Sequence, residues 1–204
     1  MITSIKSPFL EYKMTILRNK KTSNSLFRQT MNEVSYLIAA DVLKHLKFKK
    51  VSVQTPLTKT TGKDLAQQVI LVPILRAGLG LLEGFVKFLP EAEKGHIGLY
   101  RDEQTYKPVE YLFKLPKTKN KKVLVLDPML ATGNSSIAAI NLIKNTGVNI
   151  KDVSLISLLA EGIKNVQKTH RSLHIFTCQI DTKLDKNKFI VPGLGDAGDR
   201  YMGT

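Results

Sequence analysis

The chain has 204 residues, of which 43% are hydrophobic, and its formal net charge is +14. The mean hydropathy of -0.08, together with the lack of a long apolar run or a signal-peptide core, argues against membrane-spanning and secreted classes. The single cysteine, Cys178, excludes an intrachain disulfide and fits a reducing cytosol. We therefore expect one soluble, cytoplasmic domain that comprises residues 1–204.

Four lysine-rich clusters contribute to the positive charge, at residues 18–21, 47–50, 117–122 and 183–188. Such clusters can bind nucleic acid. These ones fall in predicted loops and are not interleaved with aromatic residues, so no stacking platform is evident. We expect a solvated surface and no nucleic-acid partner, although the positive field would steer polyanionic substrates toward a site.

The first half of the chain begins with a predicted extended arm over residues 1–20. From 25 to 46, apolar residues recur at three- and four-residue steps, which predicts an amphipathic helix. The next elements, in chain order, are a short strand or loop end at 51–54, a buried strand at 69–73, an apolar helix to about residue 89, and a strand at 96–101.

In the second half, residues 104–122 carry two prolines and a lysine-rich turn between alternating segments, which predicts an antiparallel β excursion. The elements predicted after it are a strand at 123–126 with a helix behind it, a strand at 153–159, a helix near 163–170 and a strand at 173–180. Strands that alternate with helices predict an α/β fold with a mostly parallel central sheet. Residues 189–204 contain too many glycines for a regular element and are predicted to form a loop.

The most informative segment is VLVLDPMLATGNS, residues 123–135. Its apolar run predicts a strand that is covered on both faces, and Asp127 follows at the carboxyl end, where α/β sheets keep their ligands. Small residues and hydroxyls then lead into a helix, whose N-terminus can bind phosphate. The segment lacks the motifs of a Walker loop and of a dinucleotide fingerprint. An ordinary strand–loop–helix junction capped by Ser135 is the structural alternative.

Two other strand ends carry an arginine. Arg76 precedes Ala-Gly-Leu-Gly, and its forked guanidinium suits phosphate oxygens, although a surface arginine before a turn would look the same. Arg101 stands beside Asp102 and Glu103, which could simply pair with it. In the tail, small residues would let the backbone approach a ligand closely. The four histidines are dispersed, and none has the spacing of a metal site.

Two motifs together, DPMLATG at 127–133 and PGLGDAGDR at 192–200, resemble the uracil phosphoribosyltransferases, which have the type I phosphoribosyltransferase fold. The wider family usually has two adjacent acids in the first motif. Pro128 in the second position is characteristic of the uracil branch. The resemblance covers nearly the whole chain, and it implies transfer of a phosphoribosyl group from phosphoribosyl pyrophosphate (PRPP) to uracil, giving UMP and pyrophosphate.

The resemblance also implies roles for matching residues. Asp127 and Arg101 are the expected catalytic residues, with Asp127 facing the ribose hydroxyls and Arg76 and Arg101 neutralising the pyrophosphate. The other residues expected to contact PRPP are Pro128, Met129, Leu130, Ala131, Thr132, Gly133, Asn134, Ser135 and Asp196. The residues expected around uracil are Ile190, Gly195, Asp196 and Ala197.

Mg²⁺ is the implied cofactor, and we expect PRPP phosphates to hold it, with no direct side-chain ligand and a contact to Asp196 through water. The β excursion, about residues 102–121, is implied to be a mobile hood that excludes water. The resemblance further implies a homodimer or larger homo-oligomer and GTP as an allosteric activator. The alternative is a regulator on the same fold that senses PRPP or nucleotides and binds RNA. The intact tail motif argues against it.

Asn134 departs from the family pattern, which usually has glycine at this position. Asparagine is the non-glycine residue most tolerant of positive φ. We therefore expect the phosphate loop to keep its shape, with its amides directed at phosphate.

Overall fold

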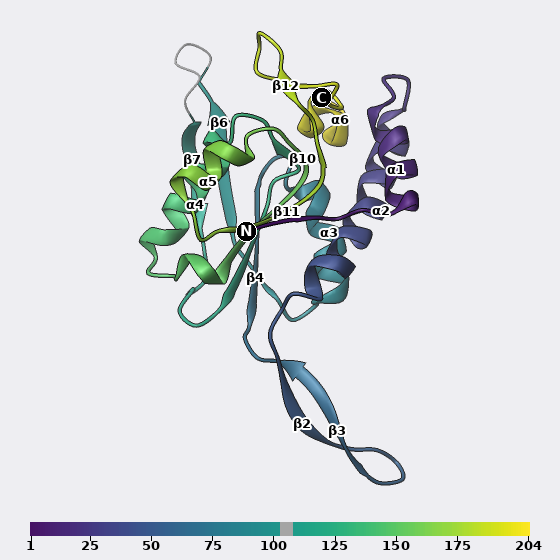
Figure 1. Ribbon diagram of the computed structural model, residues 1–204, viewed down its shortest axis with the longest axis vertical. Coiled ribbons are helices and arrows are strands. Elements are labelled where there is room, and N and C mark those ends of the chain that lie inside the picture. Colours follow the sequence, from purple (N-terminus) through teal and green to yellow (C-terminus); the bar gives the residue numbers. More distant parts are fainter. Residues whose placement is uncertain (103–107) are drawn as a thin grey trace.

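The computed structural model describes residues 1–102 and 108–204, and it describes Arg101 by its backbone alone. The body is a central β-sheet with helices on both faces, and one long β-hairpin extends away from it (Figure 1). Within the described ranges, no helix combines the length and the apolar character needed to cross a membrane.

The central sheet has the strand order β1-β11-β10-β8-β4-β6-β7, with β5 beside β4 and β9 beside β10. These strands are β1 (Ile2–Ser4), β4 (Val69–Leu75), β5 (Glu93–Lys94), β6 (His96–Arg101), β7 (Pro108–Lys114), β8 (Lys122–Leu126), β9 (Met129–Leu130), β10 (Val153–Ala160) and β11 (His174–Ile180). Every pairing in this sheet is parallel among the described residues, except that between β6 and β7. The predicted α/β class with a mostly parallel sheet is therefore confirmed.

Helices cover both faces of the sheet, and neighbouring residues of each strand point to opposite faces. Leu71, Leu124 and Ile156 pack in one core with α1 (Pro8–Arg18), α2 (Asn24–Leu43) and α3 (Leu79–Phe88). Their chain neighbours pack in a second core with α4 (Asn134–Asn145) and α5 (Ile163–Thr169). A short helix, α6 (Ala197–Met202), joins the first core, and a 3-10 turn, η1 (Ile150–Asp152), precedes β10. Two covered faces explain the continuous apolar runs of β4, β8 and β10.

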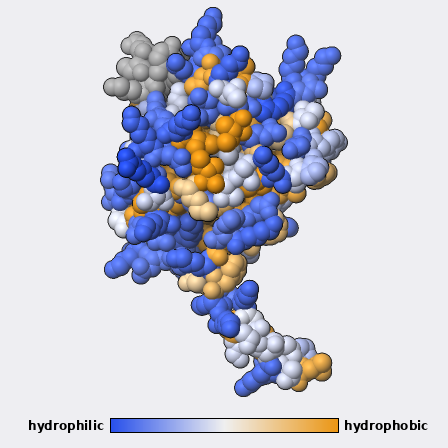
Figure 2. Space-filling view, viewed as in Figure 1, coloured by the Kyte–Doolittle hydropathy of each residue, from blue (hydrophilic) through white to orange (hydrophobic). Residues whose placement is uncertain are grey.

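The extending hairpin consists of β2 (Phe48–Gln54) and β3 (Lys59–Leu65), which pair antiparallel along their whole length. Only the first strand is predicted from sequence, and it is longer than expected. The second, KTTGKDL, is polar and mostly exposed, so it has no apolar signal. Apolar surface marks the far end of the hairpin (Figure 2), where Leu57 is 94% exposed.

The prediction of an extended arm over residues 1–20 is wrong. Residues 2–4 form β1 at the edge of the sheet, and residues 8–18 form α1. Ser7 caps this helix by accepting a hydrogen bond from the amide of Leu10, and Pro8 occupies the first helical position. The helix buries Leu10, Met14 and Leu17, which are spaced to share one face.

The tail is also more regular than predicted. A short antiparallel pair, β12 (Lys183–Leu184) and β13 (Ile190–Val191), comes before α6. Asp196 caps α6 through its own carboxylate, which accepts the amide of Asp199. A side-chain cap and the burial of Ala197 and Gly198 outweigh the poor helix propensity of a glycine-rich segment.

The predicted β excursion is antiparallel where the structure describes it, since β7 runs against β6. Residues 103–107 of the predicted hood lie outside the described residues.

Candidate active site

The segment from Asp127 to Ser136, called the 127–136 loop below, follows β8 at the carboxyl edge of the sheet, includes β9 and ends in the first turn of α4. The carbonyl of Pro128 accepts the amides of Leu158 and Leu159, both at 3.0 Å, which ties the loop to β10. Gly133 is the residue before α4 and has a φ of 81°. No side-chain hydrogen bond caps this helix, so Ser135, which lies inside it, is not the cap that the alternative interpretation requires.

Asp127 is buried, with 8% of its surface exposed. Its Oδ2 accepts a hydrogen bond from the Ser136 hydroxyl at 2.7 Å. Burial raises the pKa of Asp127 to about 6, while the hydrogen bonds from Ser136 and from the Met129 backbone partly offset that rise. Asp127 is therefore a carboxylate at neutral pH that gains a proton only a little below it.

The loop approaches α5 very closely. A Cβ on Gly162 would lie 2.4 Å from the carbonyl oxygen of Ala131, and one on Gly133 would lie 2.8 Å from Val166 Cγ2. The side-chain amide of Asn165 donates to the carbonyl of Thr132 at 2.8 Å. These contacts fix the backbone that leads into α4, where the orphan amides of a helix N-terminus favour an anion.

Asn134 does not adopt the positive φ that the substitution for glycine suggests. It is the first residue of α4, and the left-handed conformation falls on Gly133 instead. Its side-chain oxygen is 3.3 Å from Nδ2 of Asn165.

A cavity of about 470 Å³ opens beside this loop. It is lined by most of the predicted site residues: Arg76, Asp127, Met129, Ala131, Ser135, Ile190, Gly195, Asp196 and Ala197. A smaller cavity of about 100 Å³ shares Asp127, Met129, Ala131 and Ser135 with it and adds Thr132, Gly133 and Asn134. The two motifs, which are distant in sequence, therefore line one cavity.

Two predicted residues, Pro128 and Leu130, do not line either cavity. The backbone of Pro128 is bound to β10, and the side chain of Leu130 is buried in the core beneath the loop. Arg101 ends β6, where it pairs with Pro108, and its side chain lies outside the described residues. Their predicted contacts with PRPP stay predictions.

Arg76 lies between the cavity and α6. Its Nη2 donates to Asp199 Oδ1 at 2.7 Å, and its Nη1 donates to the Thr204 hydroxyl at 3.2 Å. About half of each charged side chain is exposed, at 52% for Arg76 and 47% for Asp199. Ion pairs in such exposed positions contribute little, so an anionic ligand can replace Asp199 at small cost.

Several residues of the site escape the sequence analysis. Ser136 follows the motif and reads as an ordinary helix residue, and Gly162 acts only by having no side chain. Lys188 reads as part of a surface cluster, yet it lines both cavities with a φ of 66°. Tyr100 and Tyr111 line the larger cavity from β6 and β7, with ring centroids 6.4 Å apart. The residues that these side chains lie beside are distant in the sequence, so most of these roles become apparent only in three dimensions. Lys188 gives a weak sequence signal, because it is a lysine in a polar loop beside the tail motif.

The electrostatic character of the cavity is mixed, with Arg76 and Lys188 opposite the acids Asp127 and Asp196. Among the residues that the structure describes, no group of three or more His, Cys, Asp or Glu side chains is placed to hold a metal ion. Carboxylates beside a helix N-terminus suited to an anion are compatible with a hard cation that arrives with its own phosphate ligands.

Comparisons with known proteins agree with this architecture. A hypoxanthine phosphoribosyltransferase from Staphylococcus aureus superposes with a TM-score of 0.51 at 12% identity, covering 82% of this chain and 85% of that chain. The AQ2163 protein from Aquifex aeolicus superposes with a TM-score of 0.92 at 32% identity, covering 98% of this chain and 97% of that one. The fold is thus that of the type I phosphoribosyltransferases.

The sequence comparisons narrow this class. The family model for uracil phosphoribosyltransferase matches residues 4–204. The uracil phosphoribosyltransferase of Streptococcus salivarius is 47% identical over 203 residues, which cover 98% of this chain and 97% of the relative. The chain belongs to the uracil phosphoribosyltransferase family.

Proposed function

We propose that this chain transfers the phosphoribosyl group of PRPP to N1 of uracil, releasing pyrophosphate and forming UMP. The observation that carries this proposal is that the 127–136 loop and the tail line one cavity, so the two substrates can meet there. Membership of the family and the named relative support the same reaction. They give no support to the alternative of an RNA-binding regulator.

In this reaction the bond from ribose C1 to the pyrophosphate oxygen breaks, a bond from C1 to uracil N1 forms, and the N1 proton is released to pyrophosphate or solvent. Positive charge develops on the ribose ring as the leaving group departs. A buried carboxylate at Asp127, held by Ser136, favours that charge and accepts hydrogen bonds from the ribose hydroxyls. The protein therefore acts by positioning and electrostatics and needs no covalent intermediate.

The phosphates of PRPP have two binding regions. The 5-phosphate binds at the amides and hydroxyls of Thr132 to Ser135, where α4 begins. The pyrophosphate binds Arg76, which exchanges its contact with Asp199 for phosphate oxygens, and Arg101 contributes a second charge.

Mg²⁺ would fit this arrangement as an ion held by PRPP phosphates, and Asp196 would contact it through water. When bound, it would supply positive charge that offsets the charge of the pyrophosphate leaving group. Tyr111 of β7 lines the cavity and belongs to the region, about residues 102–121, that we propose closes over the site and excludes water.

Uracil presents one N–H donor between two carbonyl acceptors, a pattern that backbone groups can match. Gly195 has a φ of 80°, and Ile190 and Ala197 supply apolar surface at the cavity wall. The absence of a side chain at Gly195 lets the base approach the backbone.

The test is to incubate the protein with Mg²⁺, PRPP and a panel of bases and to identify the nucleotide by chromatography. We expect UMP and pyrophosphate in equal amounts from uracil, and loss of product when a chelator removes the metal. Formation of no nucleotide from uracil, or of a purine nucleotide instead, would overturn the proposal.

Three further properties are part of the proposal. We propose that the chain forms a homodimer or larger homo-oligomer, which the protruding β2–β3 hairpin and its exposed apolar tip support. Sedimentation of the purified protein tests this directly. GTP activation is tested by repeating the assay with GTP added. We also propose a cytoplasmic location, which the single cysteine, Cys178, supports, since it is a free, buried thiol.

A further inference from the structure

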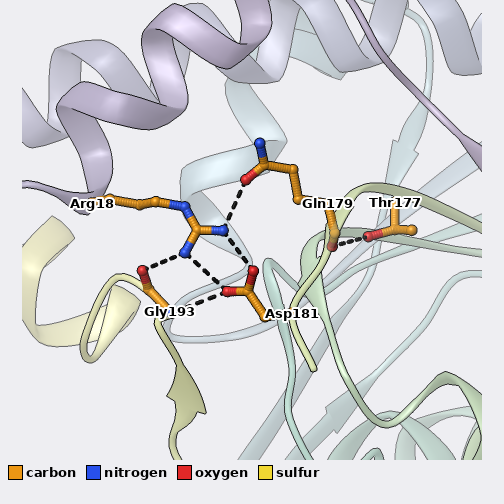
Figure 3. Close-up of polar contacts among 5 residues, drawn as sticks. All are labelled: Arg18, Thr177, Gln179, Asp181 and Gly193. Carbon is orange, nitrogen blue, oxygen red and sulfur yellow. Dashed lines mark hydrogen bonds and ion pairs between the residues drawn. The ribbon is translucent and has the colours of Figure 1, made fainter. Parts of the chain in front are cut away.

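A shielded ion pair lies where the tail leaves the body of the protein (Figure 3). Arg18 is the last residue of α1, and Asp181 directly follows β11. Two nitrogens of Arg18 donate to the two carboxylate oxygens of Asp181, at 2.9 and 2.8 Å. The exposed fractions of the side chains are 22% and 9%. A bidentate pair shielded from water is among the stronger charge-assisted contacts.

This ion pair also binds the backbone of the tail at Gly193. Arg18 Nη1 donates to the carbonyl of Gly193 at 2.7 Å, and the amide of Gly193 donates to Asp181 Oδ2 at 3.0 Å. Arg18 Nη2 further donates to Gln179 Oε1 at 2.8 Å, which fixes the plane of the guanidinium (Figure 3). Both backbone polar groups of one tail residue are thus held by one pair of charges.

A second arginine ties the next tail residue to the same end of α1. Arg200 Nη1 donates to the carbonyls of Leu194 at 2.6 Å and of Leu17 at 2.5 Å. Its guanidinium lies over the ring of Phe27, 4.3 Å from the centroid. The end of α1 therefore serves as the anchor for two consecutive tail residues.

Arg18, Gln179 and Asp181 do not line either of the cavities at the active site. Ile190 and Gly195, which flank the bound segment, do line the larger one. These three side chains can therefore affect the reaction only by holding the tail backbone in position. Recognition by backbone groups requires placement within about 0.5 Å, and a glycine-rich segment loses much entropy when it is ordered.

We propose that Arg18 and Asp181 form a positioning pair that fixes the uracil-reading backbone and thereby sets the KM for uracil, without touching either substrate. This inference rests on the proposed function, since it takes the tail to be the uracil site. Ordering the tail before uracil arrives removes an entropic cost from binding.

The test is steady-state kinetics of UMP formation by Arg18→Gln and Asp181→Asn, varying each substrate while the other is saturating. We expect the KM for uracil to rise about tenfold or more, while the KM for PRPP stays within about twofold of wild type. Arg18→Lys keeps the charge but loses the fork, so its KM for uracil should fall between those of wild type and Arg18→Gln.

The matched control is Lys13→Gln. Lys13 also lies on α1 and forms an ion pair with Glu33 of α2 at 2.7 Å, with 15% and 33% of the side chains exposed. The variant loses this ion pair between α1 and α2 but keeps every contact between α1 and the tail, so the KM for uracil should not change. Thermal melts confirm that each variant is folded, and Asp181→Asn and Arg18→Lys carry the test if Arg18→Gln does not fold.

Three results would overturn the positioning role: an unchanged KM for uracil in a folded variant of the pair, an equal rise in both KM values, or the same rise in Lys13→Gln. Wild-type protein that makes no UMP would instead overturn the proposed function, which keeps the two failures distinct.

Discussion

The two sides of the substrate cavity are built in different ways. The loop from Asp127 to Ser136 is one continuous segment, and its central hydrogen bond joins residues nine positions apart. The tail depends on contacts with α1, where Arg18 binds Gly193 across 175 positions and Arg200 binds Leu17 across 183. The first side takes its residues from one strand–loop–helix segment, which contacts with β10 and α5 hold in place. The second side is held by contacts between the two ends of the chain.

This difference implies that each side can be damaged separately. Changes in the loop should alter chemistry and PRPP binding, and changes in the tail should alter uracil binding. Variants that affect both substrates equally would contradict the separation.

The largest effect is expected from Asp127→Asn. Turnover should fall by about a hundredfold or more, because the variant lacks the charge that favours a cationic ribose. Its fold should become more stable at pH 7.5, because the buried carboxylate has a pKa of about 6, above the ordinary value of 3.8. This difference corresponds to about 3 kcal/mol at most.

The sign follows from proton binding. The folded state holds the proton more tightly than the unfolded chain, so the wild type loses stability as the pH rises from about 4 to about 6. Above that window the free-energy cost of burying the charged carboxylate is fully present. Asparagine is neutral and does not have this cost. Urea unfolding at pH 7.5 and at pH 4 measures this: the advantage of the variant should shrink at the lower pH. Near-normal turnover would refute the catalytic role of Asp127.

The next effect is expected from Gly193→Ala on the tail side. The added Cβ would lie 2.0 Å from the carbonyl oxygen of Ile190, at a φ of 57° that disfavours a side chain. The backbone must shift, so the KM for uracil should rise by about tenfold or more with little change in the KM for PRPP.

Gly147→Ala is the control for backbone strain. Gly147 also has a positive φ, of 86°, but a Cβ there meets nothing within 4 Å. It should lower the melting temperature through the strained φ alone and leave both KM values unchanged. Equal kinetic changes in the two variants would show that strain, and not the position of the tail, governs uracil binding.

A smaller effect, specific to the loop, is expected from Ser136→Ala. The hydroxyl stabilises the charged form of Asp127, so its loss should raise the pKa of that carboxyl further. In the wild type we expect kcat/KM for PRPP to fall below about pH 6, and this acid limb should move to higher pH in the variant. At pH 8 the variant should differ from wild type by only about twofold to threefold. An acid limb that does not move would show that Asp127 does not control it.

The same division separates what the sequence predicts from what it does not. The strand order could not be deduced, but the buried strands, α2 and α4 follow from apolar patterns that local sequence displays. The loop was recognisable because Asp127, Thr132 and Gly133 are adjacent in the chain.

The long-range contacts left no comparable pattern. In the sequence, Arg18 resembles any of several surface charges. The segment of α1 suggests an extended arm, because its cap and its buried face carry little signal without the rest of the core. Gly162 and Asn165 act on a loop some thirty positions earlier, as the hydrogen bond from Asn165 to Thr132 shows with its separation of 33 positions. A role that depends on contacts between distant segments cannot be predicted from the sequence of either segment alone.

The smallest effect, and a test of how local the loop is, is expected from Asn134→Gly. The family resemblance suggested that asparagine replaces a glycine with positive φ, but Gly133 carries that conformation and Asn134 begins α4. The phosphate-binding backbone is set by Gly133, by the close approach at Gly162 and by the hydrogen bond from Asn165 to Thr132, all of which the variant keeps. The affinity for PRPP, measured by calorimetry, should therefore change by about twofold and by less than tenfold.

Gly133→Ala, whose Cβ would lie 2.8 Å from Val166 Cγ2 at a φ of 81°, should weaken PRPP binding far more. If Asn134→Gly had the larger effect of the two, the side chain of Asn134 would itself have to bind phosphate, and the backbone would not be the main source of affinity in the loop.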